Sequence, residues 1–259
     1  MRKNKGQKMS KNITLYRGDA LEVMEYLKQN GIKVDLVVTD VPFGTTQCSW
    51  DSVIPFAPMW KALDGITNAN TAILIHGTEP FSSMLRVSNI KNFKYDWVWD
   101  KIKGTGFLNA KIQPMRNHEL ISVFYKKQPT YNPQKTTGHK NKKTFRSKGL
   151  QTEVYGHLGK DYYYESTERY PKSIQIFSSD TQKSSLHPTQ KPVALLEYLI
   201  KTYTNKGDLV LDFTMGSGTT MVACQNIGRR GIGIELEKNY FGIAQDRVLK
   251  AQGKVGLFA

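Results

Sequence analysis

The sequence predicts an α/β fold built on an open, largely buried sheet. Two short apolar runs rich in β-branched or aliphatic residues, 34–38 and 209–211, are typical of buried strands. Segments with apolar residues at helical spacing stand between such runs, and this alternation is typical of α/β proteins. With 259 residues, the chain can bury a substantial core as one domain, or as one domain with an insertion.

The first half of the chain alternates between strand and helix patterns. Leu21, Met24 and Leu27 lie at helical spacing and predict a helix over residues 19–29. Pro80 suits the first turn of a helix over residues 80–87, and a weaker helical pattern covers residues 58–66. A polar, glycine-containing loop is expected over residues 101–117. The strands expected in this half are residues 13–16, 34–39, 71–76, 95–99 and 119–125.

Regular structure resumes at Pro188, after an irregular segment. Val193, Leu196 and Ile200 contribute to one apolar face and predict a helix over residues 189–203. The remaining elements are strands over residues 208–213 and 231–235, and helices over residues 218–227 and 238–250.

The chain is strongly basic, with a net charge of +15 and a pI near 9.6. Such an excess favours a polyanionic partner, nucleic acid before a membrane, although charge kept for solubility is the alternative. No stretch approaches the roughly 20 apolar residues of a membrane span. Residues 1–12 are basic and polar, which predicts a flexible arm. Cys48 and Cys224 are too few for a metal cluster or a disulfide framework, so a cytoplasmic protein is expected.

Residues 126–185 differ in composition from the rest of the chain. Twelve Lys and Arg residues stand against five acids, and six tyrosines are interspersed. Because periodicity is poor, we expect a loop-rich inserted region, with a solvated, partly disordered loop as the alternative. Basic and aromatic side chains together suit contact with phosphates and bases. The side chains assigned to nucleic-acid binding are Lys126, Lys127, Lys140, Lys142, Lys143, Arg146 and Lys148.

A carboxylate, a proline and an aromatic ring follow the first apolar strand. Ligands of open α/β sheets bind outside the carboxyl ends of the strands, where Asp40 stands. Asp40 can accept hydrogen bonds from an amino group, and Pro42 biases Val41 toward an extended backbone that aims its carbonyl at the same group. Phe43 offers a flat face to a planar ring. These groups suit the exocyclic amine of a nucleobase, although an ordinary strand-ending turn explains the tetrapeptide equally well.

A glycine-rich turn follows the second apolar strand. Gly216 and Gly218 let the backbone approach a ligand, and the helix that follows offers free amides. Glu235 ends the next strand 17 residues after Gly218, where an acid commonly holds the ribose of an adenosine-containing cofactor. A phosphate-binding loop requires a lysine where Thr219 stands, and a dinucleotide fingerprint requires a glycine where Met221 stands. S-adenosylmethionine is therefore favoured over nicotinamide or flavin cofactors.

Together these motifs resemble the S-adenosylmethionine-dependent DNA amino-methyltransferases, specifically the permuted (beta) class in which the target-amine motif precedes the cofactor motif. Asp-Val-Pro-Phe at residues 40–43 is similar to the family's Asp-Pro-Pro-Tyr, and Asp-Phe-Thr-Met-Gly-Ser-Gly-Thr-Thr at residues 212–220 to its glycine motif. The family's His-Pro-Thr-Gln-Lys-Pro is matched in full at residues 187–192. The likeness covers residues 13–125 and 186–250, and the whole chain looks most like the phage-type adenine methylases.

The resemblance implies a Rossmann-like methyltransferase sheet, mostly parallel with one antiparallel strand, with helices on both faces and a circularly permuted motif order. Residues 13–125 and 186–259 would form the catalytic and cofactor-binding domain, and residues 126–185 an inserted target-recognition region. Double-stranded DNA is the implied substrate, and a bacterial or phage-infected cytoplasm is the expected compartment. Members of the family often form homodimers, but no residue of this sequence indicates the assembly. The implied chemistry requires no metal.

The resemblance also implies the role of each motif residue. Asp40 and the Val41 carbonyl would accept the two N–H groups of a flipped-out base, Phe43 would stack on the base, and Pro42 would stiffen the loop. A second set of residues would hold S-adenosylmethionine. The ribose would lie at the end of the last strand, the adenine near the start of the chain and the methionine part at the glycine turn. The set is Asp19, Asp40, His187, Thr189, Lys191, Asp212, Phe213, Gly216, Ser217, Gly218, Thr219 and Glu235.

Two departures from the family motif leave alternatives open. Val41 replaces the first proline, which makes the loop less rigid, and Phe43 lacks only the tyrosine hydroxyl. We expect a site-specific adenine-N6 methyltransferase of the restriction-modification kind, because many cytosine-N4 enzymes of the family have serine where Asp40 stands. A cytosine-N4 methyltransferase and a catalytically degenerate DNA-binding relative are the alternatives.

Overall fold

The computed structural model describes residues 6–44, 53–149, 151–152, 156–157, 159–179 and 190–255. The chain divides into a larger unit, formed by Met1–Asn132 with Ser173–Ala259, and a smaller unit, Pro133–Lys172. No helix within the described ranges is long and apolar enough to cross a membrane.

In its described residues, the larger unit has one mixed sheet and six α-helices. Its strands are β1 (Gln7–Lys8), β2 (Ile13–Arg17), β3 (Val34–Thr39), β4 (Thr67–Gly77), β5 (Phe93–Thr105), β6 (Arg116–Phe124), β11 (Ile174–Ile176), β12 (Leu209–Asp212) and β13 (Arg230–Glu235). Its helices are α1 (Ala20–Gln29), α2 (Phe56–Ile66), α3 (Phe81–Ser88), α4 (Val193–Tyr203), α5 (Thr219–Asn226) and α6 (Lys238–Val255), with a short 3₁₀ turn, η1 (Phe107–Asn109).

The sheet is mostly parallel, in the order β1-β2-β13-β12-β3-β4-β6-β5-β11. Strand β6 runs antiparallel to both of its neighbours, as expected for one strand of the sheet. The short β1 is a second antiparallel strand, which the sequence did not predict. It forms within the predicted flexible arm, because Gln7 and Lys8 pair with Leu15 and Thr14 on the exposed edge of β2.

Helices cover both faces of the sheet, and the strand pleat sorts the apolar side chains between them. Leu36 and Val38 of β3 belong to a buried cluster with the apolar faces of α4, α5 and α6. Val37, between them, belongs to a second cluster with α1, α2 and α3. Because successive side chains of a strand point to opposite faces, one continuous apolar run supplies both cores. The expected three-layer α/β architecture is confirmed.

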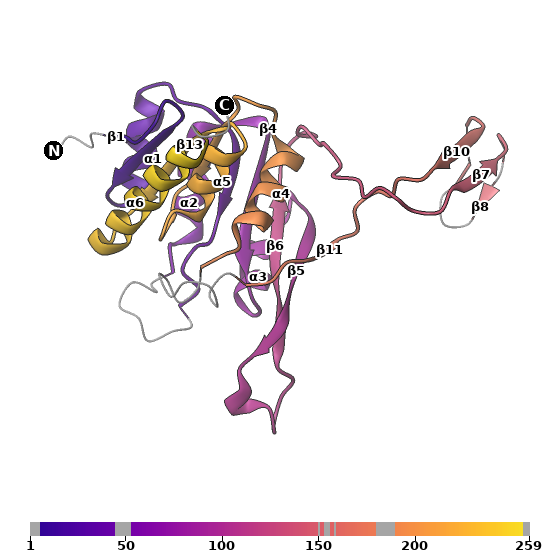
Figure 1. Ribbon diagram of the computed structural model, residues 1–259, viewed down its shortest axis with the longest axis horizontal. Helices are drawn as coiled ribbons and strands as arrows, with labels where there is room; N and C mark the ends of the chain where they lie inside the picture. The colour runs from indigo at the N-terminus through magenta and orange to yellow at the C-terminus, as the bar shows by residue number, and fades with distance from the viewer. Residues whose placement is uncertain are drawn as a thin grey trace. The chain divides into compact units, whose positions relative to one another are not determined.

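Strands β5 and β6 are longer than the sequence predicted and form a ribbon that continues past the body of the sheet (Figure 1). Residues 101–117 were expected to form a loop. Residues 101–105 instead belong to β5 and residues 116–117 to β6, with Thr105 paired to Arg116, whereas residues 106–115 lie outside the strands as expected. The register shifts between Asp100 and Thr105. Ile102 in this interval has a left-handed backbone, and its amide hydrogen bonds the Asp100 carboxylate. Pairing between β5 and β6 therefore extends strand structure into both ends of this polar segment.

The part of the smaller unit that the structure describes has four short strands: β7 (Lys142–Arg146), β8 (Gln151–Thr152), β9 (Gly156–His157) and β10 (Tyr162–Ser166). Strands β7 and β10 pair in antiparallel register, as do β8 and β9. The unit is shorter than the predicted insert of residues 126–185. Asn132 is tied to the end of α4 through the Thr202 carbonyl at 2.7 Å, and β11 pairs with β5, so both flanking segments belong to the larger unit.

Candidate active site

A cavity of about 740 Å³ opens at the carboxyl edge of the sheet in the larger unit. Strands β3 and β12 are adjacent and parallel, with Leu36 opposite Val210 and Val37 opposite Leu211. The residues that follow them, Asp40 after β3 and the turn after Asp212, therefore reach the same edge, and both line the cavity. Two motifs more than 170 positions apart in the chain thus meet in one site.

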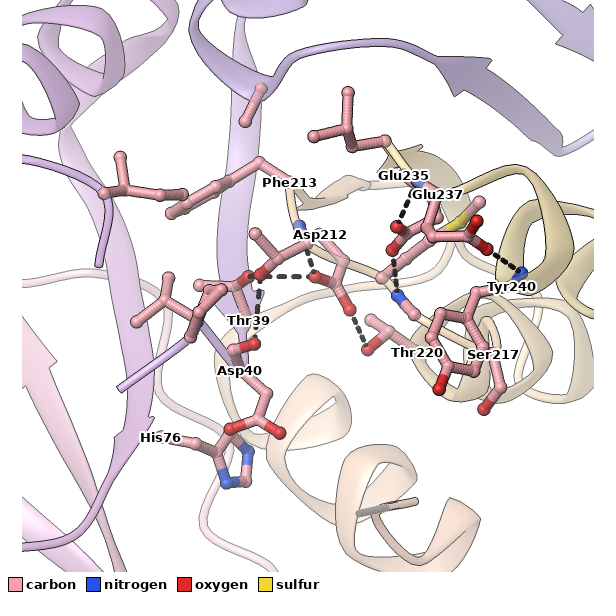
Figure 2. Close-up of a pocket in the computed structure, with 18 of the residues that line it drawn as sticks. Thr39, Asp40, His76, Asp212, Phe213, Ser217, Thr220, Glu235, Glu237 and Tyr240 are labelled. Atoms are coloured by element: carbon pink, nitrogen blue, oxygen red, sulfur yellow. Dashed lines mark hydrogen bonds between the residues drawn. The ribbon is translucent and has the colours of Figure 1, made fainter. Parts of the chain in front are cut away.

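Hydrogen bonds lock the ends of these two strands together (Figure 2). The Thr39 hydroxyl donates to Asp212 Oδ1 at 2.9 Å and lies 2.6 Å from the Thr214 hydroxyl. Thr214 in turn donates to the Asp40 backbone carbonyl at 3.1 Å. The position of Asp40 is therefore coupled to the glycine turn through two hydroxyl groups.

The Asp212 carboxylate is buried and fully engaged with the protein backbone and hydroxyls. Besides Thr39, it accepts hydrogen bonds from the Thr220 hydroxyl at 2.6 Å and from the Thr214 amide at 3.2 Å. Burial raises the pKa of Asp212 to about 6, against the lowering effect of these hydrogen bonds. These hydrogen bonds connect Asp212 to β3 and to both ends of the turn that follows, and so stabilise the conformation of that turn.

The glycine turn combines an open backbone with tight packing. Gly218 has φ +78°, and a Cβ placed there would lie 2.8 Å from the Ala244 Cβ of α6. Position 218 therefore requires glycine for two reasons, the packing of α6 against the turn and the positive φ of the backbone. The Arg247 guanidinium braces the same turn by donating to the Ser217 carbonyl at 2.7 Å and to the Thr219 hydroxyl at 3.0 Å.

Glu235 ends β13 beside the glycine turn. Its Oε2 accepts a hydrogen bond from the Gly216 amide at 2.9 Å, and its Oε1 accepts one from the Glu237 amide at 2.8 Å. Burial raises the pKa of Glu235 above its ordinary value. Each carboxylate oxygen has more than one acceptor direction, so these bonds leave capacity for hydroxyl donors in the cavity. Asp19 lines the same cavity and caps α1 by accepting from the Leu21 amide at 2.9 Å.

A network of buried charges stands on the other side of Asp40. Lys191 Nζ lies 2.7 Å from Asp40 Oδ2 and 3.1 Å from Glu119 Oε2. Glu119 is shared with Lys101, whose Nζ lies 3.2 Å from Oε1. Burial opposes charge on Glu119, but the Lys191 and Lys101 ammonium groups outweigh it and lower the pKa of Glu119 to about 2. Burial likewise opposes charge on Lys191, but Asp40 and Glu119 hold its pKa above the ordinary value.

His76 stands at the end of β4 and contributes a neutral ring to the cavity wall. The side chain is fully buried, and neither ring nitrogen has a hydrogen-bond partner among the described residues. Burial lowers the pKa of His76 to about 3, and the nearby Lys191 charge acts in the same direction. The imidazole is therefore uncharged at neutral pH.

The segment after Asp40 supplies an aromatic ring at the cavity. Val41 is buried in the core beneath α1, α2 and α3. The Phe43 ring packs against Phe81, with centroids 4.9 Å apart and planes tilted by 38°. Phe43 is only partly buried and lines the cavity, so part of its surface faces the open volume.

Most of the predicted site residues in the described ranges lie around this cavity. Gly218 shapes the turn without lining the cavity, and His187 and Thr189 lie outside the described residues. The predicted site residues that line the cavity are Asp19, Asp40, Val41, Pro42, Phe43, Lys191, Asp212, Phe213, Gly216, Ser217, Thr219 and Glu235.

The side chains predicted to bind nucleic acid divide between the two units. Lys126 and Lys127 belong to the larger unit, where the Lys127 amide bonds the Ala69 carbonyl near the start of β4. That is the edge of the sheet opposite the cavity, and Lys126 is ion-paired there with Asp64 at 2.9 Å. The remaining predicted side chains are exposed and belong to the smaller unit: Lys140, Lys142, Lys143, Arg146 and Lys148.

The sequence reasoning assigned no role to several polar groups in or beside the cavity wall. Thr39, His76 and Thr214 each stand at or just after the carboxyl end of a parallel strand, and that position was the available signal. Glu119 lies near the start of β6 and reaches the same edge only because β6 is antiparallel. Arg247 acts from the middle of α6, and no local pattern in the sequence identifies its contact with the turn.

The chain matches the family model described as DNA methylase over residues 34–246. Among curated proteins, it is 30% identical over 231 residues to the type II methyltransferase M1.MboII of Moraxella bovis, covering 80% of this chain and 86% of the relative. It is 26% identical over 250 residues to the type II methyltransferase M.HpaI of Haemophilus parainfluenzae, covering 89% of this chain and 72% of that protein.

Solved structures of methyltransferases share the fold. The complex of M1.HpyAVI with S-adenosylmethionine superposes with a TM-score of 0.62 at 28% identity, covering 91% of this chain and 99% of that one. The cytosine-N4-specific PvuII DNA methyltransferase superposes with a TM-score of 0.64, covering 95% and 93% of the two chains. Its 16% identity supports likeness of fold alone.

Proposed function

The chain belongs to the family of S-adenosylmethionine-dependent DNA amino-methyltransferases, and from that membership we propose that it methylates the N6 amine of a flipped-out adenine in double-stranded DNA. The observation that carries the proposal is the meeting of Asp40 and the glycine turn at one cavity. A carboxylate that can hold an amine thereby faces a turn that can hold a methyl donor. The Asp40 carboxylate, in place of the serine of many cytosine-N4 enzymes, supports adenine as the base.

The residues of the cavity fit S-adenosylmethionine. About 740 Å³ lies within the range of sites that hold ligands of this size. We assign the ribose hydroxyls to Glu235, the adenine to Asp19, and the methionine end to Lys191 and the backbone around Gly216 and Ser217. When bound, S-adenosylmethionine supplies an electrophilic methyl group on a sulfonium sulfur.

Asp40 prepares the target amine for attack. The lone pair of an adenine amine is delocalised into the ring, so the amine is a weak nucleophile. In the proposal, Asp40 and the Val41 carbonyl accept one N–H each, which localises that lone pair, and Phe43 stacks on the base. A nitrogen–carbon bond forms, the sulfur–carbon bond breaks, and the amine proton passes to Asp40 or to water.

Lys191 and Glu119 set the electrostatics around Asp40. In the structure, the Lys191 ammonium is held between the two carboxylates, at 2.7 Å and 3.1 Å. Lys191 contacts Oδ2 of Asp40, and a shift of its ammonium group toward Glu119, which already lies within ion-pair distance, would leave more of the Asp40 charge for the amine. Glu119 is therefore a positioning residue in this proposal, since it acts on the reaction through Lys191.

The smaller unit is the proposed site of target recognition. It carries nine basic and four acidic residues. Lys142 and Arg146 lie on β7, and the paired strand β10 adds the exposed rings of Tyr162 and Tyr163. Cations for phosphates beside rings for bases are what DNA contact requires.

The proposal is tested with radiolabelled S-adenosylmethionine and unmethylated genomic duplex DNA, followed by nucleoside analysis of the product. We expect label in N6-methyladenine with the wild type and none above background with Asp40→Ala. Label in N4-methylcytosine would refute adenine as the base. Bound DNA without any incorporated label would instead identify a degenerate DNA-binding relative.

A further inference from the structure

We propose that the tip of the β5–β6 ribbon is an apolar wedge that enters duplex DNA beside the target base and stabilises the flipped-out state. The wedge comprises Phe107, Leu108 and Ile112, which lie between the two strands of the ribbon. The inference rests on the proposed function, because only an enzyme that extracts a base from the stack needs such an element.

The topology places the tip on the same side as the cavity. Gly77, the last residue of β4, pairs with Leu120 near the start of β6. Because β6 is antiparallel to β4, the segment before Arg116 continues beyond the carboxyl edge, where the cavity opens. Glu119 lines the cavity from the base of the ribbon, and the ribbon continues from there past the body of the sheet (Figure 1).

The tip exposes large apolar side chains that the fold does not use. Phe107 is 73% exposed, and Leu108 and Ile112 are each 84% exposed. Isolated exposed apolar residues are common on protein surfaces, but here three large ones lie within residues 107–112, at one hairpin end. Phe107 and Leu108 lie within the short 3₁₀ turn η1 at this end of the ribbon.

The charge around the tip identifies the partner as a polyanion. Residues 101–118 contain four Lys and Arg residues and no Asp or Glu. Lys103 and Arg116 flank the ribbon, and Lys111 lies within the tip; all three are exposed. Cations around an apolar point match the backbone phosphates on either side of a base step, with the apolar groups between the bases.

The same positive charge disfavours a second copy of this chain as the partner that binds the ribbon tip. Two identical tips would bring Lys103, Lys111 and Arg116 of each copy close to their counterparts without any acid from residues 101–118 to compensate. A duplex instead supplies both an apolar base stack and negative charge. A dimer contact at the tip is kept as one outcome of the test.

The wedge acts on the equilibrium between stacked and flipped base. Extracting a base leaves a gap in the stack, and unstacking costs a few kcal/mol. Apolar side chains inserted at the step replace part of the lost contact, as in other proteins that insert wedges between bases. The benefit should therefore depend on how strongly the target base is paired.

The experiment compares Phe107→Ala/Leu108→Ala with the control Val87→Ala/Ile90→Ala. The control residues are also exposed, but they lie at and after the end of α3, between α3 and the start of β5. Two oligonucleotide duplexes carry the methylation site mapped with the wild type: one fully paired, one with an abasic site opposite the target base. Initial rates of radiolabelled methyl transfer and the affinity for S-adenosylmethionine are measured.

We expect the wedge variant to lose roughly tenfold or more in rate on the paired duplex and less than about threefold on the abasic duplex, where flipping is easy. Its affinity for S-adenosylmethionine and both control rates should match the wild type. Equal losses on the two duplexes, or no loss, would refute the wedge while leaving the proposed function intact. A change of oligomeric state in light scattering with the paired-duplex rate retained would identify a dimer contact. No transfer by the wild type would overturn the proposed function and the wedge together.

Discussion

The Lys191 ammonium nitrogen lies 2.7 Å from Asp40 Oδ2, and both groups line the cavity. The side chain of Lys191 comes from the segment that precedes α4, whereas Asp40 directly follows β3. The carboxylate proposed to receive the target amine thus already has a cationic partner before any base arrives. Glu119 offers Lys191 a second carboxylate, so the ammonium group can move between the two when a base binds.

Replacement of Asp40 is expected to separate catalysis from donor binding. Asp40→Asn should lower the rate of methyl transfer by about 10²–10⁴-fold, the range typical of a lost acid–base group. Binding of S-adenosylmethionine, measured by calorimetry, should persist because the glycine turn and Glu235 are unchanged. Asp64→Asn, at the opposite edge of the sheet, is the control and should retain activity. Full activity of Asp40→Asn would eliminate the proposed role.

The Lys191–Glu119 pair should show strong energetic coupling. Removing one partner leaves the other charge buried, so Glu119→Gln and Lys191→Met should each reduce the free energy of unfolding by about 3–5 kcal/mol. The double variant should lose less than the sum of the two. Lys28 and Glu25, an exposed pair on α1, provide the control cycle, whose coupling should be far weaker because solvent screens the two charges. Denaturant unfolding measures both cycles, and additive losses would contradict the assignment.

The stability contributed by Glu119 should depend on pH. Its pKa is lowered to about 2 in the folded protein, so its contribution is complete above about pH 4.5 and is lost as the pH falls toward 2. The stability difference between wild type and Glu119→Gln should shrink across that window. A difference that is constant between pH 5 and pH 2.5 would rule out the buried ion pair as its source.

His76 should destabilise the fold in mild acid. The folded protein keeps the ring neutral down to about pH 3, whereas the unfolded chain protonates it near pH 6.5. Relative to His76→Gln, the wild type should therefore lose about 1.4 kcal/mol of unfolding free energy per pH unit below pH 6.5. Asp212 titrates in the same range but is present in both proteins, so its effect cancels in the difference. Parallel pH profiles of the two proteins would show that the ring titrates alike when folded and unfolded.

Two glycines with similar backbone conformations allow the effect of side-chain packing on stability to be separated from the effect of backbone strain. Gly218 and Gly228 both have positive φ, +78° and +68°, but a Cβ at Gly228 meets nothing within 4 Å. Gly218→Ala should therefore cost about 1–3 kcal/mol more than Gly228→Ala, because its methyl group collides with Ala244. Denaturant unfolding of both variants gives the comparison. Equal losses would mean that α6 moves away from the turn without resistance.

The cations of the smaller unit should set the salt dependence of DNA binding. If Lys142 and Arg146 each neutralise one phosphate, the double alanine variant should reduce the slope of log K against log[salt] by about 2. Lys126→Ala/Lys127→Ala, at the opposite edge of the sheet from the cavity, should leave the slope unchanged. Fluorescence anisotropy with a labelled duplex at several salt concentrations measures both. The reverse pattern would place the DNA on the other edge of the sheet.

The sequence was sufficient to predict structure where the residues of one short segment determine its conformation. The apolar run at β3 and the glycine turn after β12 predicted strands and a cofactor turn, since pleat periodicity and positive φ are properties of short segments. It was insufficient at the two ends of residues 101–117, because a polar stretch becomes a strand only when a partner strand is present to pair with it.

The amino-acid sequence by itself determined the α/β class, the positions of Asp40 and of the glycine turn, and the excess of positive charge. Tertiary structure alone decided that Lys191 and Glu119 stand beside Asp40, that His76 is buried neutral, and that Phe107 is left exposed at a ribbon tip. The physical reason is that ion pairing, burial and exposure depend on which strands become neighbours. That arrangement is settled by packing of the whole sheet and is not encoded in any one segment.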